Sequence, residues 1–251
     1  MVTDTTSVRS QDVKVVRGAA HRGTARVVGT LLIVCSVATL LSVAPLGSLL
    51  ESPVDLAQLA ANDNAVVLTA LIEFVAAASC AGIAIALYPV LRRYGPAMAF
   101  GAAAARVVEA ALVLVSTLSL LALLSLAQES VDAGVTDTVV TDASVQVLLA
   151  VREWLPNFLI LLPFLLGAGL YYVLMYRSRI VPRWLSVWGL LAVALSLVAT
   201  VYSGFTQDFG MATFSTALNA PIGLQEMVLA VWLIAKGFNR QATLPPAQNR
   251  P

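Results

Sequence analysis

Six long apolar segments, separated by short polar ones, constrain the fold of this 251-residue chain more than any other feature. Each segment has about 20 residues or more, the length that a helix needs to cross about 30 Å of hydrocarbon. Hydrophobic residues make up 59% of the chain and charged residues 12%, whereas a soluble domain carries roughly 25% charge. The sequence therefore predicts an all-α, polytopic membrane bundle of six transmembrane helices in a single domain.

Charged and proline-rich turns set the expected limits of the spans. We expect the spans at about residues 27–50, 65–90, 97–127, 143–176, 184–203 and 217–235. Together they form a transmembrane domain, residues 27–236, between a polar tail at 1–26 and a tail at 237–251 that we expect to be disordered. Pro53 is expected to open a short interfacial helix, and Pro156 and Pro163 to kink the fourth span.

Positive charge falls on one side of this topology. Thirteen of the fifteen Lys and Arg residues lie in the N-terminal tail, in two Arg-rich turns or at the C-terminal end. The three loops on the other side have no Lys or Arg and are acidic. The positive-inside rule then predicts that both termini are cytoplasmic. The Lys and Arg residues of the N-terminal tail are sparse, which favours a tail that contacts anionic lipid over an arm that binds nucleic acid. We therefore expect no nucleic-acid partner.

Arg106 and Glu109 lie inside the third apolar segment, where a charge is costly. Three residues apart on a helix, they share a face and can form an ion pair. An unpaired charge near the bilayer centre costs at least a few kcal/mol, so such residues normally face partners or a cavity. At about 1.5 Å per helical residue, Arg106 and Glu226 both lie roughly 14 Å from the predicted cytoplasmic boundary. The sequence therefore predicts a polar layer near the midplane.

Other polar residues extend this layer toward the predicted outer face. The candidate pocket residues are Glu73, Arg106, Glu109, Arg152, Glu153, Asn157, Gln225 and Glu226. We expect Glu73, Arg106, Glu109 and Glu226 to converge, with Arg152 and Glu153 at the mouth of the fourth span. The predicted geometry is a polar pocket that is open to the outside and closed toward the cytoplasm. The alternative is that the same charges only hold the helices together through buried ion pairs.

Several classes of site are excluded by residues that the spans lack. The single histidine, His21, lies in the N-terminal tail, which excludes a bis-histidine haem, a histidine zinc site and a histidine-based triad. Lys236 stands at the end of the last span, and no lysine lies within one, so a Schiff-base cofactor has no attachment point. We predict no cofactor and no metal, and the sequence leaves the catalytic residues, if the chain is an enzyme, unknown. Cys35 and Cys80 lie in apolar segments, where we expect free thiols.

The sequence resembles a family of bacterial six-span membrane proteins of the domain-of-unknown-function 4386 type. The resemblance covers about residues 24–239 and rests on the stretches 71–74, 86–94, 106–110, 151–154, 174–189 and 223–238. It supports the six-span topology and implies no activity, because none is established for the family. Together with the charge distribution it implies a multi-pass protein of the bacterial cytoplasmic (inner) membrane.

Three functions remain open at this point. The first is an outward-facing pocket that binds or transports a small cationic or amphipathic ligand, which can be a lipid. The second is a structural or regulatory helix bundle whose ion pairs have no other role. The third is an intramembrane lipid-modifying enzyme with a protonated glutamate as general acid. The residues do not decide whether the chain is an enzyme. Six spans are few for a monomeric alternating-access carrier, so transport would favour a homo-oligomer.

Overall fold

The computed structural model describes residues 5–47, 49–50, 54–134, 138–207, 209 and 213–239, and every regular element among them is helical. The helices are α1 (Thr5–Leu41), α2 (Leu56–Ala61), α3 (Asp63–Leu91), α4 (Pro96–Ala133), α5 (Thr138–Trp154), a π-helical turn η1 (Leu155–Leu159), α6 (Leu161–Ser178), α7 (Arg183–Thr206) and α8 (Thr213–Ala235). The predicted C-terminal disorder concerns mainly residues 240–251, which lie outside the described residues.

Six of these segments are long and apolar enough to cross a membrane. They are Arg22–Leu41, Asp63–Leu91, Pro96–Ala133, Ala143–Ser178, Arg183–Thr206 and Ala217–Ala235. Large apolar side chains such as Leu40, Ile85 and Leu191 are more than half exposed on the outside of the bundle. Apolar surface on this scale is compatible with a lipid environment and not with water. The predicted all-α, six-span membrane fold is confirmed.

The first span ends at Leu41 instead of continuing to Leu50. Pro45 explains the difference, because the residue before a proline avoids the helical conformation and the proline cannot donate a backbone hydrogen bond. The expected short helix in the following loop is present as α2. It begins after Asp55, whose carboxylate accepts hydrogen bonds from the backbone N–H groups of Ala57 and Gln58.

The fourth span departs from a regular α-helix at Pro156, where a kink was expected. Leu155–Leu159 form a π-helical turn, and the N–H of Ile160 donates to the carbonyl of Leu155 at 2.8 Å. Pro156 has no N–H to donate, so the regular pattern is interrupted there. Pro163 lies in the first turn of α6, a position at which proline is tolerated.

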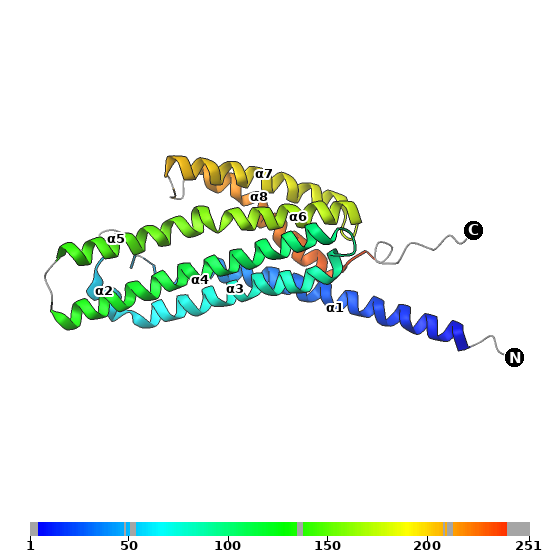
Figure 1. Cartoon of the computed structure of the whole chain (residues 1–251), viewed down its shortest axis with the longest axis horizontal. Helices are drawn as coiled ribbons and strands as arrows, with labels where there is room; N and C mark the ends of the chain where they lie inside the picture. Colours follow the sequence, from blue (N-terminus) through cyan, green and yellow to red (C-terminus); the bar gives the residue numbers. More distant parts are fainter. Residues whose placement is uncertain are drawn as a thin grey trace.

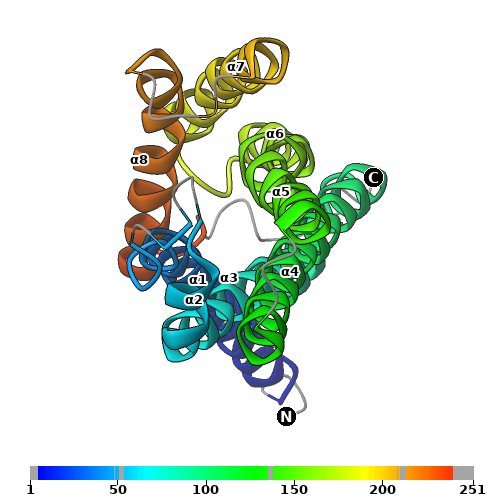
Figure 2. The same ribbon diagram turned by 90° about the vertical axis from the view of Figure 1, so that its left-hand side faces the viewer.

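The spans form a ring in chain order. α1 packs on α3, α3 on α4, α4 on α6, α6 on α7 and α7 on α8, and the ring closes because α8 packs on α1 (Figure 2). The start of α1 and the end of α8 lie at the same end of the bundle (Figure 1). This end carries Arg92, Arg93, Arg177, Arg179 and Lys236, and we call it the basic end. The opposite end carries α2 and we call it the acidic end.

The largest apolar cluster fills the basic end of the ring. It includes Leu87, Leu91, Leu174, Met175 and Leu185, all at most 2% exposed. A smaller cluster at the acidic end packs α2 against α3, α4 and α5, with Leu59 and Leu120 at its centre. The buried charged residues lie between these two clusters, in two separate layers.

Candidate functional site

The layer nearer the acidic end joins α3, α4 and α5 around Glu73. The Arg152 guanidinium binds the Glu73 carboxylate in a fork, with Nη2 2.6 Å from Oε1 and Nη1 3.1 Å from Oε2. Thr117 donates to Oε2 at 2.7 Å, and Arg152 Nη1 also donates to the Ser116 hydroxyl at 3.2 Å. We call these four residues the Glu73 layer. Its charges are equal and opposite, and both carboxylate oxygens accept hydrogen bonds.

The second layer lies near the middle of the ring, around Arg106 of α4. Arg106 Nη1 is 3.0 Å from Glu109 Oε2 and 3.3 Å from Oε1. Both residues are buried, at 3% and 6% exposure. The Cys80 thiol of α3 donates to Glu109 Oε1 at 3.3 Å, and Cys35 Sγ of α1 lies 3.3 Å from Cys80 Sγ. With Glu226 of α8, these residues form what we call the Arg106 layer.

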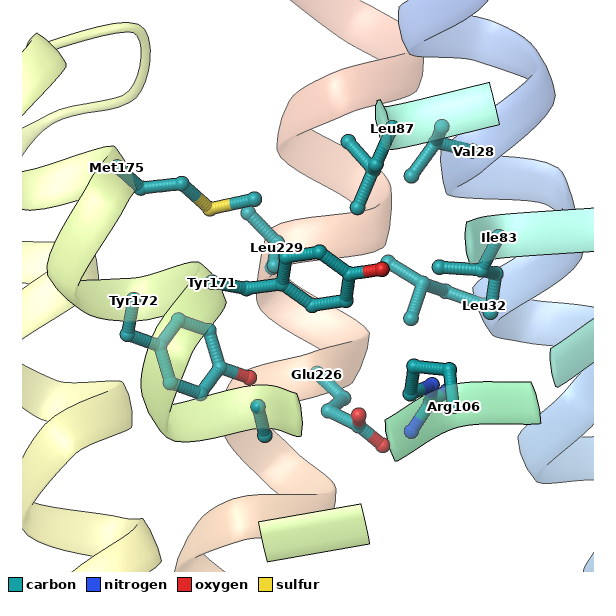
Figure 3. Close-up of a pocket in the computed structure, with 11 residues that line it drawn as sticks. Val28, Leu32, Ile83, Leu87, Arg106, Tyr171, Tyr172, Met175, Glu226 and Leu229 are labelled. Atoms are coloured by element: carbon teal, nitrogen blue, oxygen red, sulfur yellow. The ribbon is translucent and has the colours of Figure 1, made fainter. Parts of the chain in front are cut away.

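Glu226 reaches the Arg106 layer across a central cavity. Figure 3 shows its carboxylate pointing toward the Arg106 side chain. In the part of the chain that the structure describes, Glu226 makes no hydrogen bond and no ion pair. The Arg106 Nε atom and the Tyr171 hydroxyl are buried and also have no hydrogen-bond partner there. The layer is therefore incompletely paired, although five helices contribute to its surroundings.

The cavity between these groups is small. Its volume is about 20 Å³, enough for one water molecule. Apolar side chains of α1, α3, α6 and α8 line it, together with Arg106, Glu226 and the rings of Tyr171 and Tyr172 (Figure 3). Phe164 packs on the other side of Arg106, with its ring centroid 5.3 Å from the guanidinium carbon. The cavity thus has walls of mixed polarity, and the predicted outward-open ligand pocket stays a prediction.

The eight predicted site residues separate into four groups. Glu73 and Arg152 form one ion pair, and Arg106 and Glu109 form another, with Glu226 opposite. Gln225 is fully buried and joins helices, since it accepts from the Tyr172 hydroxyl and donates to the Leu185 carbonyl. Glu153 is exposed, and the Asn157 amide donates to its backbone carbonyl. Glu73 is thus not part of the predicted convergence, because its fork with Arg152 holds it in the other layer.

Three residues close to these charges were missed as site residues by sequence reasoning. Cys35 and Cys80 are free thiols, as expected, but their sulfur atoms are in contact, and the Cys80 thiol also donates to Glu109. Tyr171 brings its hydroxyl to the cavity from α6. No local spacing could have indicated these contacts, because each joins helices that are far apart in sequence.

Helix number, apolar surface and buried ion pairs together define an integral, multi-pass membrane helical bundle. Residues 27–237 match the model of the family described as Domain of unknown function (DUF4386). The match covers most of the chain, so the protein belongs to this family, and the resemblance in its sequence is confirmed. Comparisons with curated proteins and with solved structures give no match.

Proposed function

We propose that the protein binds or transports a small cationic or amphipathic ligand at the Arg106 layer. The observation that carries the proposal is the Glu226 carboxylate, which faces the cavity without a hydrogen-bond or ion-pair partner among the described residues. With all three groups ionised, Arg106 contributes one positive charge and Glu109 and Glu226 two negative charges. A bound cation would balance the layer, and charge balance is strongly favoured at this depth.

The apolar side chains that line the cavity favour a ligand with an apolar part. Leu32, Ile83, Leu87 and Leu229 surround the polar groups, so one part of the ligand would contact hydrocarbon and another the carboxylate. A ligand larger than water requires a wall to move. Glu226 lies on α8, which contains Pro221; a proline inside a helix removes one backbone hydrogen bond and weakens the helix there. Movement of α8 would enlarge the cavity.

The side from which a ligand enters depends on orientation. Thirteen of the fifteen Lys and Arg residues belong to the tails and the Arg-rich turns, which supports a cytoplasmic location for the basic end and for both termini, in a bacterial inner membrane. The apolar cluster at the basic end closes the cavity on that side, which supports access from the outside. In a Cys35→Ala/Cys80→Ala background, Asp132→Cys should react with an impermeant maleimide from outside and Ser178→Cys only from inside. Labelling of both from one side would refute this topology.

A matched pair of hydrophobic ions tests the binding proposal. Tetraphenylphosphonium and tetraphenylborate have similar shapes and opposite charges, so charge recognition separates them while partition into lipid does not. We expect saturable binding of the cation to the purified protein and none of the anion. Glu226→Gln should abolish cation binding, whereas Glu153→Gln, a change at an exposed carboxylate, should leave it intact. Equal binding of both ions, or binding by the Glu226→Gln variant, would contradict the proposal.

One observation favours the structural alternative for part of the molecule. The Glu73 layer has balanced charges and forked geometry, and so needs no ligand. If the phosphonium experiment fails and mass spectrometry finds no small molecule that copurifies with the protein, both layers would be structural. The enzyme alternative has no observation of its own in the Arg106 layer, because the arrangement of Glu226 and Arg106 supports ligand binding equally well.

A further inference from the structure

Two thiols touch each other in the interior of the bundle, between α1 and α3. The sulfur atoms of Cys35 and Cys80 are 3.3 Å apart, within van der Waals contact. Cys80 is 2% exposed and Cys35 is partly buried. Small side chains, including Ala77, Ala81 and Ala110, surround the pair. A change in the side-chain torsions can therefore bring the sulfur atoms to bonding distance without displacing bulky neighbours.

The pair also has a proton acceptor. The Cys80 thiol donates to Glu109 Oε1 at 3.3 Å, and Arg106 holds the same carboxylate through its Nη1 atom. Cys35 can donate in turn to Cys80 Sγ or, at 3.7 Å, to the carbonyl of Ala76. The thiolate is the form of cysteine that attacks sulfur, and a carboxylate in contact with the thiol can take its proton. Two thiols that served only to fill space would need no such carboxylate.

Depth limits which reactants can reach these sulfur atoms. Cys80 is eleven residues from the end of α3 at Leu91, and therefore about 16 Å along the helix from the basic end. Cys35 is thirteen residues from Arg22, or about 20 Å along α1. Both sulfur atoms lie near the middle of about 30 Å of hydrocarbon. Water-soluble thiols and disulfides do not enter this region, so a reaction partner has to be soluble in lipid.

We infer that Cys35 and Cys80 form a redox-active dithiol that transfers two electrons and two protons to a membrane quinone. Quinones are lipid-soluble, and they accept two electrons and two protons to become quinols, the same number that two thiols release on forming one disulfide. The overall step converts two thiols and one quinone into one disulfide and one quinol. It does not depend on cation binding at Glu226.

The two sulfur atoms have different parts in this step. Cys35, the more accessible of the two, forms a bond from Sγ to a ring carbon of the quinone, and its proton goes to a quinone oxygen. Cys80 gives its proton to Glu109, and its Sγ attacks Cys35 Sγ. The bond between Cys35 and the ring then breaks, and its electron pair leaves with the ring. Glu109 passes the second proton to the departing quinol and is again ionised beside Arg106.

The test uses the full-length protein, reduced and reconstituted in lipid nanodiscs, with decylubiquinone as the probe. Quinone absorbance measures quinol formation, and peptide mass spectrometry measures the disulfide through the loss of two hydrogens from the linked peptides. We expect one quinol and one Cys35–Cys80 disulfide per chain. Cys35→Ser and Cys80→Ser should each form neither. A wild-type protein that stays reduced with excess quinone, or a serine variant that still forms quinol, would overturn the inference.

The role of Glu109 is tested by rate. Glu109→Gln should slow disulfide formation at least tenfold, since general-base assistance typically contributes more than this, and Glu109→Asp should recover part of the rate. Glu153→Gln serves as the matched control at an exposed carboxylate and should react at the wild-type rate. An unchanged rate in Glu109→Gln would refute its role as proton acceptor. If that variant does not fold, the wild-type stoichiometry and the two serine variants still decide whether the dithiol reacts.

Discussion

The Glu73 layer and the Arg106 layer each contain one Arg–Glu ion pair and differ in how completely their polar groups are paired. In the Glu73 layer each carboxylate oxygen accepts from Arg152, and Ser116 and Thr117 contribute further hydrogen bonds. In the Arg106 layer one guanidinium faces two carboxylates, and a guanidinium nitrogen and a tyrosine hydroxyl have no partner among the described residues. Complete pairing indicates a structural connection, whereas buried unpaired groups are typical of functional sites.

The largest effect is expected from Arg106→Leu, which removes the cation of the Arg106 layer. The variant leaves Glu109 and Glu226 without a compensating charge, and breaking a buried pair in this way typically costs about 3–5 kcal/mol. We therefore expect a strongly lowered melting temperature in detergent. The double variant Arg106→Leu/Glu109→Gln should recover part of the loss. If the single variant melts like the wild type, Arg106 is not a buried partner of these carboxylates.

A somewhat smaller loss is expected from Arg152→Leu in the Glu73 layer. The side chains of this pair are 17% and 11% exposed, so water can compensate Glu73 in part, and we expect a loss of about 2–3 kcal/mol. Glu73→Leu in the same background should restore stability, because a balanced pair is replaced by apolar residues. The stability of the Arg152→Leu variant and of the Glu73→Leu/Arg152→Leu double variant is measured by thermal unfolding in the same detergent. Cation binding should be unaffected, and its loss would show that the two layers are coupled.

The smallest change in stability is expected from Glu226→Gln. This variant should separate the two layers most clearly, because it should affect ligand binding and leave the stability almost unchanged. Because Glu226 has no partner to lose among the described residues, the free energy of unfolding should change by less than about 1 kcal/mol. The same variant should lose cation binding. A stability loss as large as that of Arg152→Leu would mean that Glu226 is a structural partner of Arg106, and the difference between the layers would disappear.

The sequence was sufficient for the features that depend on neighbouring residues. Apolar run lengths predicted the six spans, and the three-residue spacing predicted the pairing of Arg106 with Glu109. It was insufficient for contacts that depend on which helices become neighbours. Arg152 was expected at the mouth of the fourth span with no predicted partner, and it pairs with Glu73, which is 79 positions away in the chain. The contact of Cys35 with Cys80 depends in the same way on the packing of α1 on α3.

Closure of the ring has a consequence for how the protein is made. α1 is synthesised first, but one of its two neighbours in the ring, α8, is synthesised last. Gly29 of α1 lies so close to the backbone of Ala230 that a methyl group there would be 2.6 Å from the carbonyl oxygen. Until translation of α8 is finished, this face of α1 has no protein partner and contacts lipid. A chain truncated after residue 212 should therefore form an open five-span bundle in which the Arg106 layer is uncovered on the side that α8 would close.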